Sequence, residues 1–596
     1  MAELTWTGKY RDGKRVAPVR IALPFQTVET VNESTQDRGR TLDLFARGKP
    51  TEWRDRLIWG DKKYVLPSLL PELAGKVNLV YIDPPFDTGA DFSFTTEIPG
   101  SGEPLLKQPS ILEQKAYRDT WGGGLDSYLH WFYETALLLR DLLADDGSLY
   151  VHLDENVAHY AKAVLDEVFG QENFQREIVW RIGWISGYKS KAKNWIRNHD
   201  TILFYVKDRM NFTFNKQYIP YPPEYLRRDG KAPTGAGYPI EDVWNASEND
   251  RMDSIQIMSF SGEKVGYPTQ KNENLLTRIV STSSQPGDLV LDCFCGSGTT
   301  AAVAEKLGRR WITCDLGRFA IHTTRKRLLD IPGVKPFVVQ NLGKYERQAW
   351  LAAEFDKPED RAATEDAYRR FILELFHAES LSGYLWIHGM KGTRLVHVGS
   401  VDAPITIGDV REIARDALRA SATRTHDAAN AEVDVLGWEF AFELNELARE
   451  VAAETRVDVK FRRIPREVLE KKAIEQGDIQ AKDFFELRAL STKVTFTKRT
   501  VTLAITDFVL DPSDLPAEVA SAVKHWSQWI DYWAVDWDFK GDTFHNQWQS
   551  YRTRAAPDLE LEAKYEYREP GTYRVVVKVI DLLGNDTTKM LTMEVK

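Results

Sequence analysis

Asp83, Pro84, Pro85 and Phe86 are four consecutive residues whose types together can bind an amino group on a flat heterocycle. The Asp83 carboxylate accepts a hydrogen bond from an N–H, and the prolines donate none, so their carbonyl groups stay available as rigid acceptors. Phe86 adds an aromatic face for stacking. In isolation, Asp-Pro-Pro is more often only a turn after a strand. Its position in the fold therefore decides between the two interpretations.

A second motif, DCFCGSGTTA from residue 292, has the residue types of a cofactor loop. Gly296 suits a tight turn with positive φ, and Gly298 allows a ligand to approach the backbone. Thr299 and Thr300 stand at a predicted helix start, where N–H groups favour a carboxylate or phosphate. Asp315 lies 19 residues after Gly296 and suits ribose hydroxyls. The spacing indicates a nucleoside-containing cofactor, either NAD or S-adenosylmethionine; the alternative is a packing turn.

The elements around both motifs alternate between strands and helices from Leu57 to about Arg327. Val77–Ile82 is a short apolar run typical of a buried parallel strand, and Asp83 follows it directly. The same patterns predict strands at 148–153, 289–292 and 311–314, and helices at 127–143, 157–169 and 299–307. The result is a doubly wound, Rossmann-like α/β sheet, in which ligands bind at the carboxyl ends of strands.

The length of 596 residues predicts several domains. We predict an N-terminal arm at 1–55, the doubly wound domain at 56–344 with a basic insert at about 176–262, a small α/β domain at 345–490, and a mostly β, immunoglobulin- or PKD-like sandwich at 491–596. Asp434 and Asp458-Val459-Lys460 also loosely match a D…(D/E)xK nuclease core, a pattern that often arises by chance.

Composition excludes several classes of protein. Hydrophobic residues make up 43% and charged residues 28%, with no apolar run of the roughly 20 residues that cross a bilayer and no secretory signal at the start. We therefore expect an intracellular protein. Cys293, Cys295 and Cys314 are too few for a disulfide scaffold and lack metal-ligand spacing, so we expect buried thiols and no metal.

Charge is distributed unevenly along the chain. The net charge is −10, yet residues 176–233 hold twelve Lys or Arg against five Asp or Glu, a local charge of +7. A basic region in an acidic chain predicts local phosphate binding. The interleaved aromatic residues Trp180, Trp184, Tyr188, Trp195 and Tyr205 offer stacking surfaces, the alternative being a solvated surface with buried rings.

Together the motifs resemble the β group of amino DNA methyltransferases, in which the catalytic motif precedes the cofactor loop. Further similar segments are Gly60-Asp61, Tyr150–Asp154, His199–Lys207 and Tyr267–Lys271. The similarity runs from about Leu57 to Leu328 and extends to the Mod subunit of type III restriction–modification systems. Asn272 stands where the family usually has proline, and Phe86 where tyrosine is commoner. We expect both differences to have local effects only.

The resemblance implies a site-specific DNA methyltransferase that moves a methyl group from S-adenosylmethionine to adenine N6 of a flipped-out base. Asp83 in place of serine favours adenine, with cytosine N4 as the alternative. The implied catalytic residues are Asp83, Pro84, Pro85 and Phe86. The implied cofactor residues are Asp61, Gln270, Lys271, Asp292, Phe294, Gly296, Ser297, Gly298, Thr299, Thr300 and Asp315. The predicted DNA contacts are Arg176, Arg181, Lys189, Lys191, Lys193, Arg197, Arg227 and Arg228.

The resemblance implies double-stranded DNA as partner, in the cytoplasm and near the nucleoid of a prokaryote, without a membrane. A restriction or helicase subunit, another defence-system component and a second copy of the chain are further candidate partners. Because the segment at about 209–262 is short, we expect residues 345–596 or another subunit to share target recognition. Three other functions stay open: an NAD-dependent oxidoreductase, which leaves Asp83–Phe86 unexplained, a non-catalytic DNA-recognition subunit, and an RNA methyltransferase.

Overall fold

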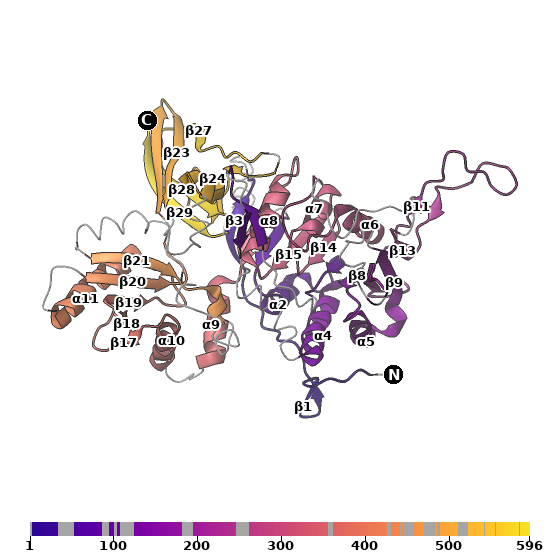
Figure 1. Ribbon diagram of the computed structural model, residues 1–596, viewed down its shortest axis with the longest axis horizontal. Coiled ribbons are helices and arrows are strands. Elements are labelled where there is room, and N and C mark those ends of the chain that lie inside the picture. The colour runs from indigo at the N-terminus through magenta and orange to yellow at the C-terminus, as the bar shows by residue number, and fades with distance from the viewer. Residues whose placement is uncertain are drawn as a thin grey trace. The chain divides into compact units, whose positions relative to one another are not determined.

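The contacts divide the chain into two compact units. The first comprises Met1–Phe25, Trp53–Phe94 and Gln108–Asn341, and the second Gln26–Glu52, Thr95–Lys107 and Leu342–Lys596. The computed structural model describes residues 3–33, 53–85, 94–100, 104–107, 124–181, 193, 195–245, 262–355, 361–425, 431–441, 444, 455, 457–469, 484, 489–509, 523–541, 543–554, 556–582 and 584–596. Figure 1 shows the arrangement of the elements within each unit.

A mixed sheet forms the centre of the first unit, in the order β13-β9-β10-β8-β5-β14-β15-β4-β16. Its strands are β4 (Asp55–Trp59), β5 (Val77–Ile82), β8 (Leu143–Leu153), β9 (Phe174–Arg181), β10 (His199–Val206), β13 (Val243–Trp244), β14 (Leu289–Asp292), β15 (Arg310–Asp315) and β16 (Phe337–Asn341). The run from β8 to β16 is parallel, whereas β10 is antiparallel to β8 and β9.

Six helices of the described chain cover this sheet. They are α2 (Lys62–Leu73), α4 (Leu125–Leu142), α5 (Ala158–Phe169), α6 (Glu273–Ser283), α7 (Thr299–Lys306) and α8 (Arg318–Leu329). The helices α2, α4 and α5 pack beside one another on one face, and α6, α7 and α8 on the other (Figure 1). The predicted doubly wound α/β fold is therefore confirmed.

The sheet core consists of the apolar runs that predicted its strands. Leu79 and Val80 of β5, Leu291 of β14 and Val151 of β8 are fully buried, as burial on both faces requires. The strand β8 starts five residues earlier than the predicted residue 148. Its pairing with β5 shifts register after Val77, and this irregularity lets the polar residues 145–147 lie within a strand.

The second unit contains a small α/β sheet in the order β17-β18-β19-β20-β21, in which β19, β20 and β21 are parallel. Its elements are α9 (Gly343–Phe355), α10 (Arg361–Leu375), β17 (Glu379–Ser380), β18 (Gly389–Lys391), β19 (Arg394–Val398), α11 (Ile407–Thr425), β20 (Ala431–Gly437) and β21 (Val457–Arg463). One face of α11 packs on the sheet through Val410, Ile413, Ala414 and Ala417. The segment between β20 and β21 lies almost wholly outside the described residues.

Two antiparallel sheets of the second unit share one hydrophobic core and form the predicted β-sandwich. Their orders are β22-β23-β27 and β26-β24-β28-β29. The strands are β22 (Ala489–Thr497), β23 (Thr500–Val509), β24 (Ile530–Asp536), β26 (Trp548–Tyr551), β27 (Glu562–Glu566), β28 (Gly571–Asp581) and β29 (Asp586–Val595). The core includes Leu503 from one sheet and Trp533 and Val577 from the other.

One strand of the second unit comes from near the start of the chain. The strand β3 (Gln26–Val31) pairs in parallel with β25 (Phe544–His545). Glu29 of β3 is fully buried and forms a 2.7 Å ion pair with Lys578. Residues within the predicted 1–55 arm therefore belong to the fold of the C-terminal half. In the part of the chain that the structure describes, no helix has both the length and the apolarity to cross a membrane.

Candidate active site

Both predicted motifs lie at the same edge of the central sheet. Asp83 follows β5, and residues 293–298 follow β14, the strand next to it. The two strands are parallel, with Leu291 paired to Val80, so their carboxyl ends coincide. Asp315 at the end of β15 and Asp61 after β4 reach the same edge. The fold thus brings together motifs that lie far apart in the sequence.

Asp83 presents its two carboxylate oxygens to different surroundings. Its Oδ2 forms a short ion pair with the ammonium of Lys271, a residue 188 positions later in the chain. Its Oδ1 is buried and has no hydrogen-bond partner among the described residues. Pro84 is buried and Pro85 half-buried, while Phe86 lies outside the described residues. A carboxylate oxygen in this state is an acceptor for a donor that a ligand brings.

The glycine loop is fixed by bonds to the neighbouring strand and helix. The Gly296 N–H donates to Asp315 Oδ2 at 2.9 Å, and the Cys295 N–H to the Cys314 carbonyl at 3.0 Å. Gly296 has φ 48° and Gly298 φ 74°, which favour glycine. A Cβ on Gly298 would lie 2.6 Å from the Thr324 side chain. Close packing against α8 therefore accounts for Gly298, in addition to the predicted ligand approach.

Asp292 is a buried carboxyl group at the start of the loop. It accepts hydrogen bonds from the Phe294 N–H at 2.9 Å and the Thr300 hydroxyl at 2.6 Å. Burial raises the pKa of Asp292 to about 7, and the charges of Asp83 and Asp315 add to this effect against the two hydrogen bonds. Asp292 therefore holds the loop and the first turn of α7 together.

A hydrogen-bonded network joins the loop to the segment before α6. The Arg327 guanidinium donates to Thr299 Oγ1 at 2.8 Å and pairs with Glu273 at 2.9 Å. The Thr299 hydroxyl in turn donates to the Lys271 carbonyl at 3.0 Å. The Gln270 amide bonds to the backbone of residues 263 and 265. Sequence reasoning did not assign a role to Arg327, because only the fold places α8 beside the loop.

Asn272, the departure from the family pattern, caps α6. Its side-chain oxygen accepts the Leu275 N–H at 2.8 Å. Asparagine is a favoured N-cap because it satisfies one of the N–H groups that lack a partner within the helix. The predicted local effect of this residue is therefore a helix cap directly after Lys271.

Aromatic and basic side chains gather near Asp61. The Asp61 carboxylate caps α2 by accepting the Lys63 N–H at 2.8 Å. The buried Lys62 ammonium lies 4.2 Å from the centre of the Trp131 ring, and that ring packs against Phe294 at 5.4 Å. Burial lowers the pKa of Lys62. Phe294 thus joins the loop to an apolar wall that also includes residues from two helices.

A buried polar chain behind Asp83 was missed from the sequence. The Tyr81 hydroxyl lies 3.0 Å from His152 Nδ1, and His152 Nε2 lies 3.2 Å from Asp200 Oδ2. Burial opposes ionisation of Asp200, but the bond to His152 and the charges of His152, Arg197 and Lys271 lower its pKa overall. Residues two apart in a strand point to the same side of the sheet, so the spacing of Tyr81 and Asp83 was the signal in the sequence that their side chains lie on one side.

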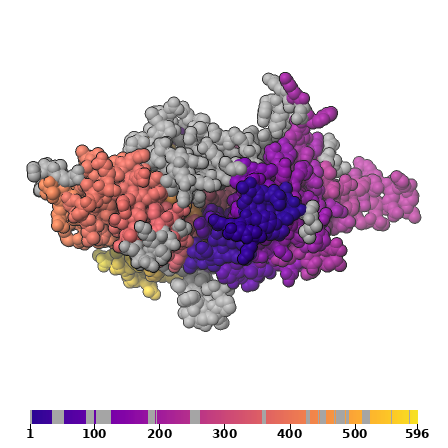
Figure 2. Space-filling view, turned by 90° about the horizontal axis from the view of Figure 1, so that it is seen from below, coloured from indigo at the N-terminus to yellow at the C-terminus, as the bar shows by residue number. Residues whose placement is uncertain are grey.

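The predicted DNA contacts are spread over several elements. Arg176 and Arg181 lie on β9, Lys193 is exposed, and Lys189 and Lys191 lie outside the described residues. Arg197 forms short ion pairs with Asp200 and Glu155, so its charge is already balanced by two carboxylates. Arg227 and Arg228 are exposed on the segment between β11 (Tyr218–Ile219) and β12 (Tyr238–Pro239). This segment projects from the first unit in both views (Figure 1, Figure 2).

The aromatic residues of the basic region do not all serve as exposed stacking surfaces. Trp180 on β9 and Tyr205 on β10 are fully buried, so this part of the prediction is wrong for them. Their strands lie within the sheet, where each side chain packs against helices or other strands. Trp195 is 97% exposed, and Trp184 and Tyr188 lie outside the described residues.

Other predicted features of the chain do not form a second site. The three cysteines are buried, as predicted. Asp434 is paired with Arg394 at 3.1 Å, and Asp458 with the same arginine at 2.7 Å, which neutralises the nuclease-like carboxylates. Among the described residues, no cluster of His, Cys, Asp or Glu has the arrangement of a metal site.

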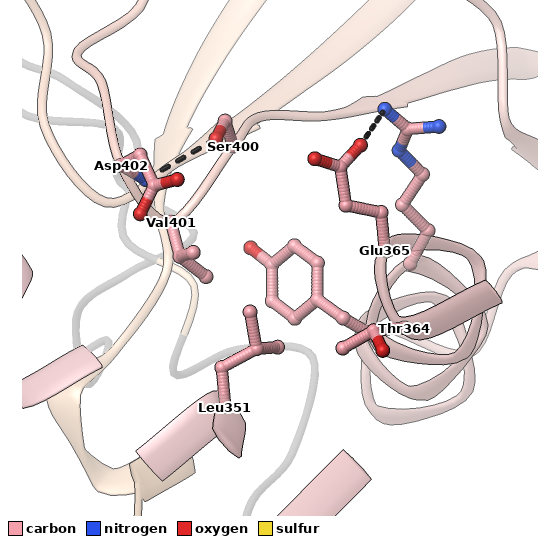
Figure 3. Close-up of a pocket in the computed structure, with 8 residues that line it drawn as sticks. Leu351, Thr364, Glu365, Ser400, Val401 and Asp402 are labelled. Carbon is pink, nitrogen blue, oxygen red and sulfur yellow. Dashed lines mark hydrogen bonds and ion pairs between the residues drawn. The ribbon is translucent and has the colours of Figure 1, made fainter. Parts of the chain in front are cut away.

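A small pocket of the second unit lies between α9, α10 and the end of β19 (Figure 3). Its polar side chains bond within the protein. Glu365 pairs with Arg369 at 3.5 Å, and Asp402 accepts a hydrogen bond from Gln348 at 2.7 Å. The Tyr368 hydroxyl donates to the Gly399 carbonyl at 3.0 Å. We therefore assign no ligand to this pocket.

Comparison with known proteins identifies the family of the first unit. The DNA methylase family profile matches residues 77–326. The type II methyltransferase M1.MboII of Moraxella bovis is 33% identical over 205 residues, 32% of this chain and 75% of that protein. The DNA adenine methyltransferase YhdJ of Escherichia coli (strain K12) is 28% identical over 280 residues, 46% of this chain and 82% of that protein.

The Mod subunit of the type III restriction-modification enzyme EcoP15I of Escherichia coli is 30% identical over 159 residues, 26% of this chain and 24% of that subunit. Asp83, the glycine loop and Asp315 lie within the matched residues 77–326, whereas Asp61 precedes them. The chain belongs to the DNA methylase family, whose methyl donor is S-adenosylmethionine. The predicted family resemblance is confirmed.

Proposed function

We propose that the chain transfers the methyl group of S-adenosylmethionine to the N6 amino group of adenine in double-stranded DNA. The observation that carries this proposal is the buried Asp83 Oδ1, which lacks a partner among the described residues and lies at the sheet edge beside the glycine loop. A target amino N–H is a donor of the kind that this oxygen accepts.

The residues at the edge fit the proposed cofactor. Asp315 accepts the N–H groups of Gly296 and Gly317, which holds its carboxylate at the edge of the sheet where ribose hydroxyls would bind. The start of α7 favours the carboxylate of the methionine part. Phe294 and Trp131 offer apolar faces to the adenine ring. When bound, S-adenosylmethionine supplies an electrophilic methyl group on a sulfonium.

Asp83 and Pro84 prepare the nucleophile in this mechanism. The lone pair of an amino group on a purine is delocalised into the ring, so the nitrogen is a weak nucleophile. Asp83 accepts one N–H and the Pro84 carbonyl the other, which favours tetrahedral geometry and directs the lone pair outward. Positive charge grows on the nitrogen during transfer, and the Asp83 carboxylate stabilises it in a water-poor site.

The flipping of the target base precedes this step, because its amino group is not accessible within the duplex. We propose that stacking on Phe86 offsets part of the cost. No covalent bond between enzyme and base is needed, since the amino nitrogen attacks the methyl group directly. The bond from the methyl carbon to sulfur breaks as the carbon–nitrogen bond forms, the neutral thioether leaves, and the nitrogen then loses its extra proton to Asp83 or to water.

Asp83→Ala tests the catalytic assignment. We expect methyl transfer to fall by at least roughly 10³-fold, since a charged group that acts in the transition state is lost. Transfer is measured with tritiated S-adenosylmethionine and unmethylated genomic DNA, and cofactor binding by calorimetry. Binding should change little. Asp145→Ala, at an exposed aspartate of the same unit, is the matched control. Equal loss of binding and transfer would contradict the role given to Asp83.

The methylated base is identified in the same DNA. After enzymatic digestion, mass spectrometry separates N6-methyldeoxyadenosine from N4-methyldeoxycytidine. The presence of aspartate at position 83 and the likeness to an adenine methyltransferase support adenine. The cytosine product would refute the base specificity but retain the methyltransferase assignment. Mapping of the modified positions in a host genome would give the recognition sequence.

We also propose a role in restriction–modification or phage defence, with the cytoplasm and nucleoid of a prokaryote as location. The likeness to a Mod subunit supports a restriction partner, and a homodimer is a second candidate. Residues 342–596 add two folded parts beyond the profile match, so shared target recognition is proposed for them. A truncation before residue 345 would also remove β25 and Lys578, the partners of β3 and Glu29, so point substitutions test this proposal better.

A further inference from the structure

Lys271 makes a contact that its predicted role in cofactor binding does not explain. Its ammonium pairs with Asp83 Oδ2, and the two side chains are only 9% and 17% exposed. Ion pairs with so little solvent access are weakly screened, so this contact fixes the orientation of the carboxylate far more than a surface pair would.

The ion pair leaves the two carboxylate oxygens of Asp83 in different surroundings. Oδ2 is held by Lys271, while Oδ1 is buried and has no hydrogen-bond partner in the described part of the chain. A carboxylate that rotated about its side-chain torsions would exchange the two oxygens. The bond to Lys271 prevents this exchange, because it holds one oxygen on a fixed cation.

The backbone of Lys271 is itself anchored to the cofactor loop. The Lys271 carbonyl accepts the Thr299 hydroxyl at 3.0 Å, and Arg327 donates to the same hydroxyl at 2.8 Å. On the other side, the Asn272 cap fixes the start of α6. Lys271 therefore extends from a point that is fixed relative to the glycine loop, and it reaches the carboxylate at the end of the adjacent strand.

We propose that Lys271 is a positioning residue for Asp83, which holds Oδ2 and so orients the carboxylate for Oδ1 to accept the amino N–H of the target base. This inference rests on the proposed function and deepens it. It replaces the cofactor carboxylate with Asp83 as the partner of the Lys271 ammonium.

The groups around Asp83 make such a cation necessary. Asp292 faces Asp83 from the end of β14, and the buried phenols of Tyr81 and Tyr128 face it from β5 and α4. Burial raises the pKa of both phenols, so they carry no compensating charge of either sign at neutral pH. Asp200 interacts with Lys271 from β10. Among these groups of the described chain, Lys271 is the one that carries a positive charge and bonds to the Asp83 carboxylate.

The experiment compares Lys271→Gln and Lys271→Arg in the full chain, with unmethylated genomic DNA and S-adenosylmethionine as substrates. Without the cation, the Asp83 carboxylate can turn about its side-chain torsions, so Oδ1 no longer holds a fixed place for the target amino group. We expect kcat of Lys271→Gln at pH 7 to fall about tenfold. The cofactor Kd and the KM for DNA should stay within about threefold. Lys271→Arg should restore much of kcat because arginine keeps a cation that can hold Oδ2.

Lys264→Gln is the matched control, since Lys264 is an exposed lysine of the same segment. A weaker cofactor Kd for Lys271→Gln with an unchanged kcat would overturn the inference and give Lys271 to the cofactor. An unchanged kcat together with unchanged binding would also overturn it. In both cases methyl transfer by the unaltered protein and its loss in Asp83→Ala would leave the proposed function intact. Absence of transfer by the unaltered protein would overturn the proposed function itself.

Discussion

Gly298 offers a direct measure of how closely the cofactor loop packs on α8. An alanine at this position would meet two costs. Its backbone would keep φ 74°, a left-handed conformation that costs a non-glycine residue about 1–2 kcal/mol. Its Cβ would lie 2.6 Å from Thr324 Cγ2 and Oγ1, and overpacking of this kind costs about 1–3 kcal/mol more. We expect Gly298→Ala to destabilise the loop by the sum of the two.

Gly308 separates these costs, because it lies two residues after the end of α7, the helix that Gly298 precedes. It has φ 70° but nothing within 4 Å of a Cβ at its position. Gly308→Ala should therefore show the backbone cost alone. Hydrogen exchange suits this comparison, since it reports local opening and does not require the two units to unfold together. The Ala302 N–H, which bonds to the Gly298 carbonyl at 3.0 Å, is the reporter amide.

Gly298→Ala should accelerate exchange at this amide by at least about fivefold more than Gly308→Ala, which corresponds to about 1 kcal/mol of packing. Thr324→Ala should recover part of the loss when combined with Gly298→Ala, because it removes Cγ2 and Oγ1, the two nearest of the three atoms that the new Cβ meets. Equal effects of the two glycine substitutions, or no recovery in the double variant, would refute the assignment of Gly298 to packing.

Two further predictions concern buried polar groups near the loop. Asp292 has a pKa of about 7 in the folded protein and 3.8 as its ordinary value, so its contribution to stability is full below pH 3.8 and is lost as the pH rises to about 7. Asp292→Asn should remove this pH dependence of the free energy of unfolding, which amounts to about 4 kcal/mol at most, and urea unfolding curves recorded across that pH range measure it. A free energy of unfolding that changes with pH in the variant as it does in the unaltered protein would contradict the prediction. Asn272→Ala should cost about 1 kcal/mol of helix stability and accelerate exchange at the Leu275 N–H, with the Ala302 N–H unchanged as control.

The sequence predicts the parts of the fold that depend on neighbouring residues. The bounds of β5 and β14 match the predicted strands, since continuous apolar runs next to Asp-Pro or glycine signals are local features. Parallel strands also end at one edge by geometry, so Asp83 and the glycine loop could be placed together before the order of the sheet was known.

The parts that the sequence does not predict depend on contacts between distant residues. The chain Tyr81–His152–Asp200 spans β5, β8 and β10, and it forms only because those three strands are neighbours in the sheet. The strand β3 joins the C-terminal half because Glu29 finds its buried partner Lys578 more than five hundred residues away. The basic sequence neighbours of Trp180 left both a stacking surface and a buried ring open, and the sheet buries the ring.

The network that runs from Arg327 through Thr299 and Lys271 to Asp83 explains how the order of the two motifs along the chain can be permuted. The contacts that relate the cofactor loop to the catalytic carboxylate are hydrogen bonds and an ion pair across the sheet edge, not a continuous segment of chain. Their geometry depends on β5 and β14 lying side by side and parallel, a relation that does not depend on which strand comes first. A rearranged connection therefore preserves the site as long as it preserves this pair of strands and the segment that ends at Lys271.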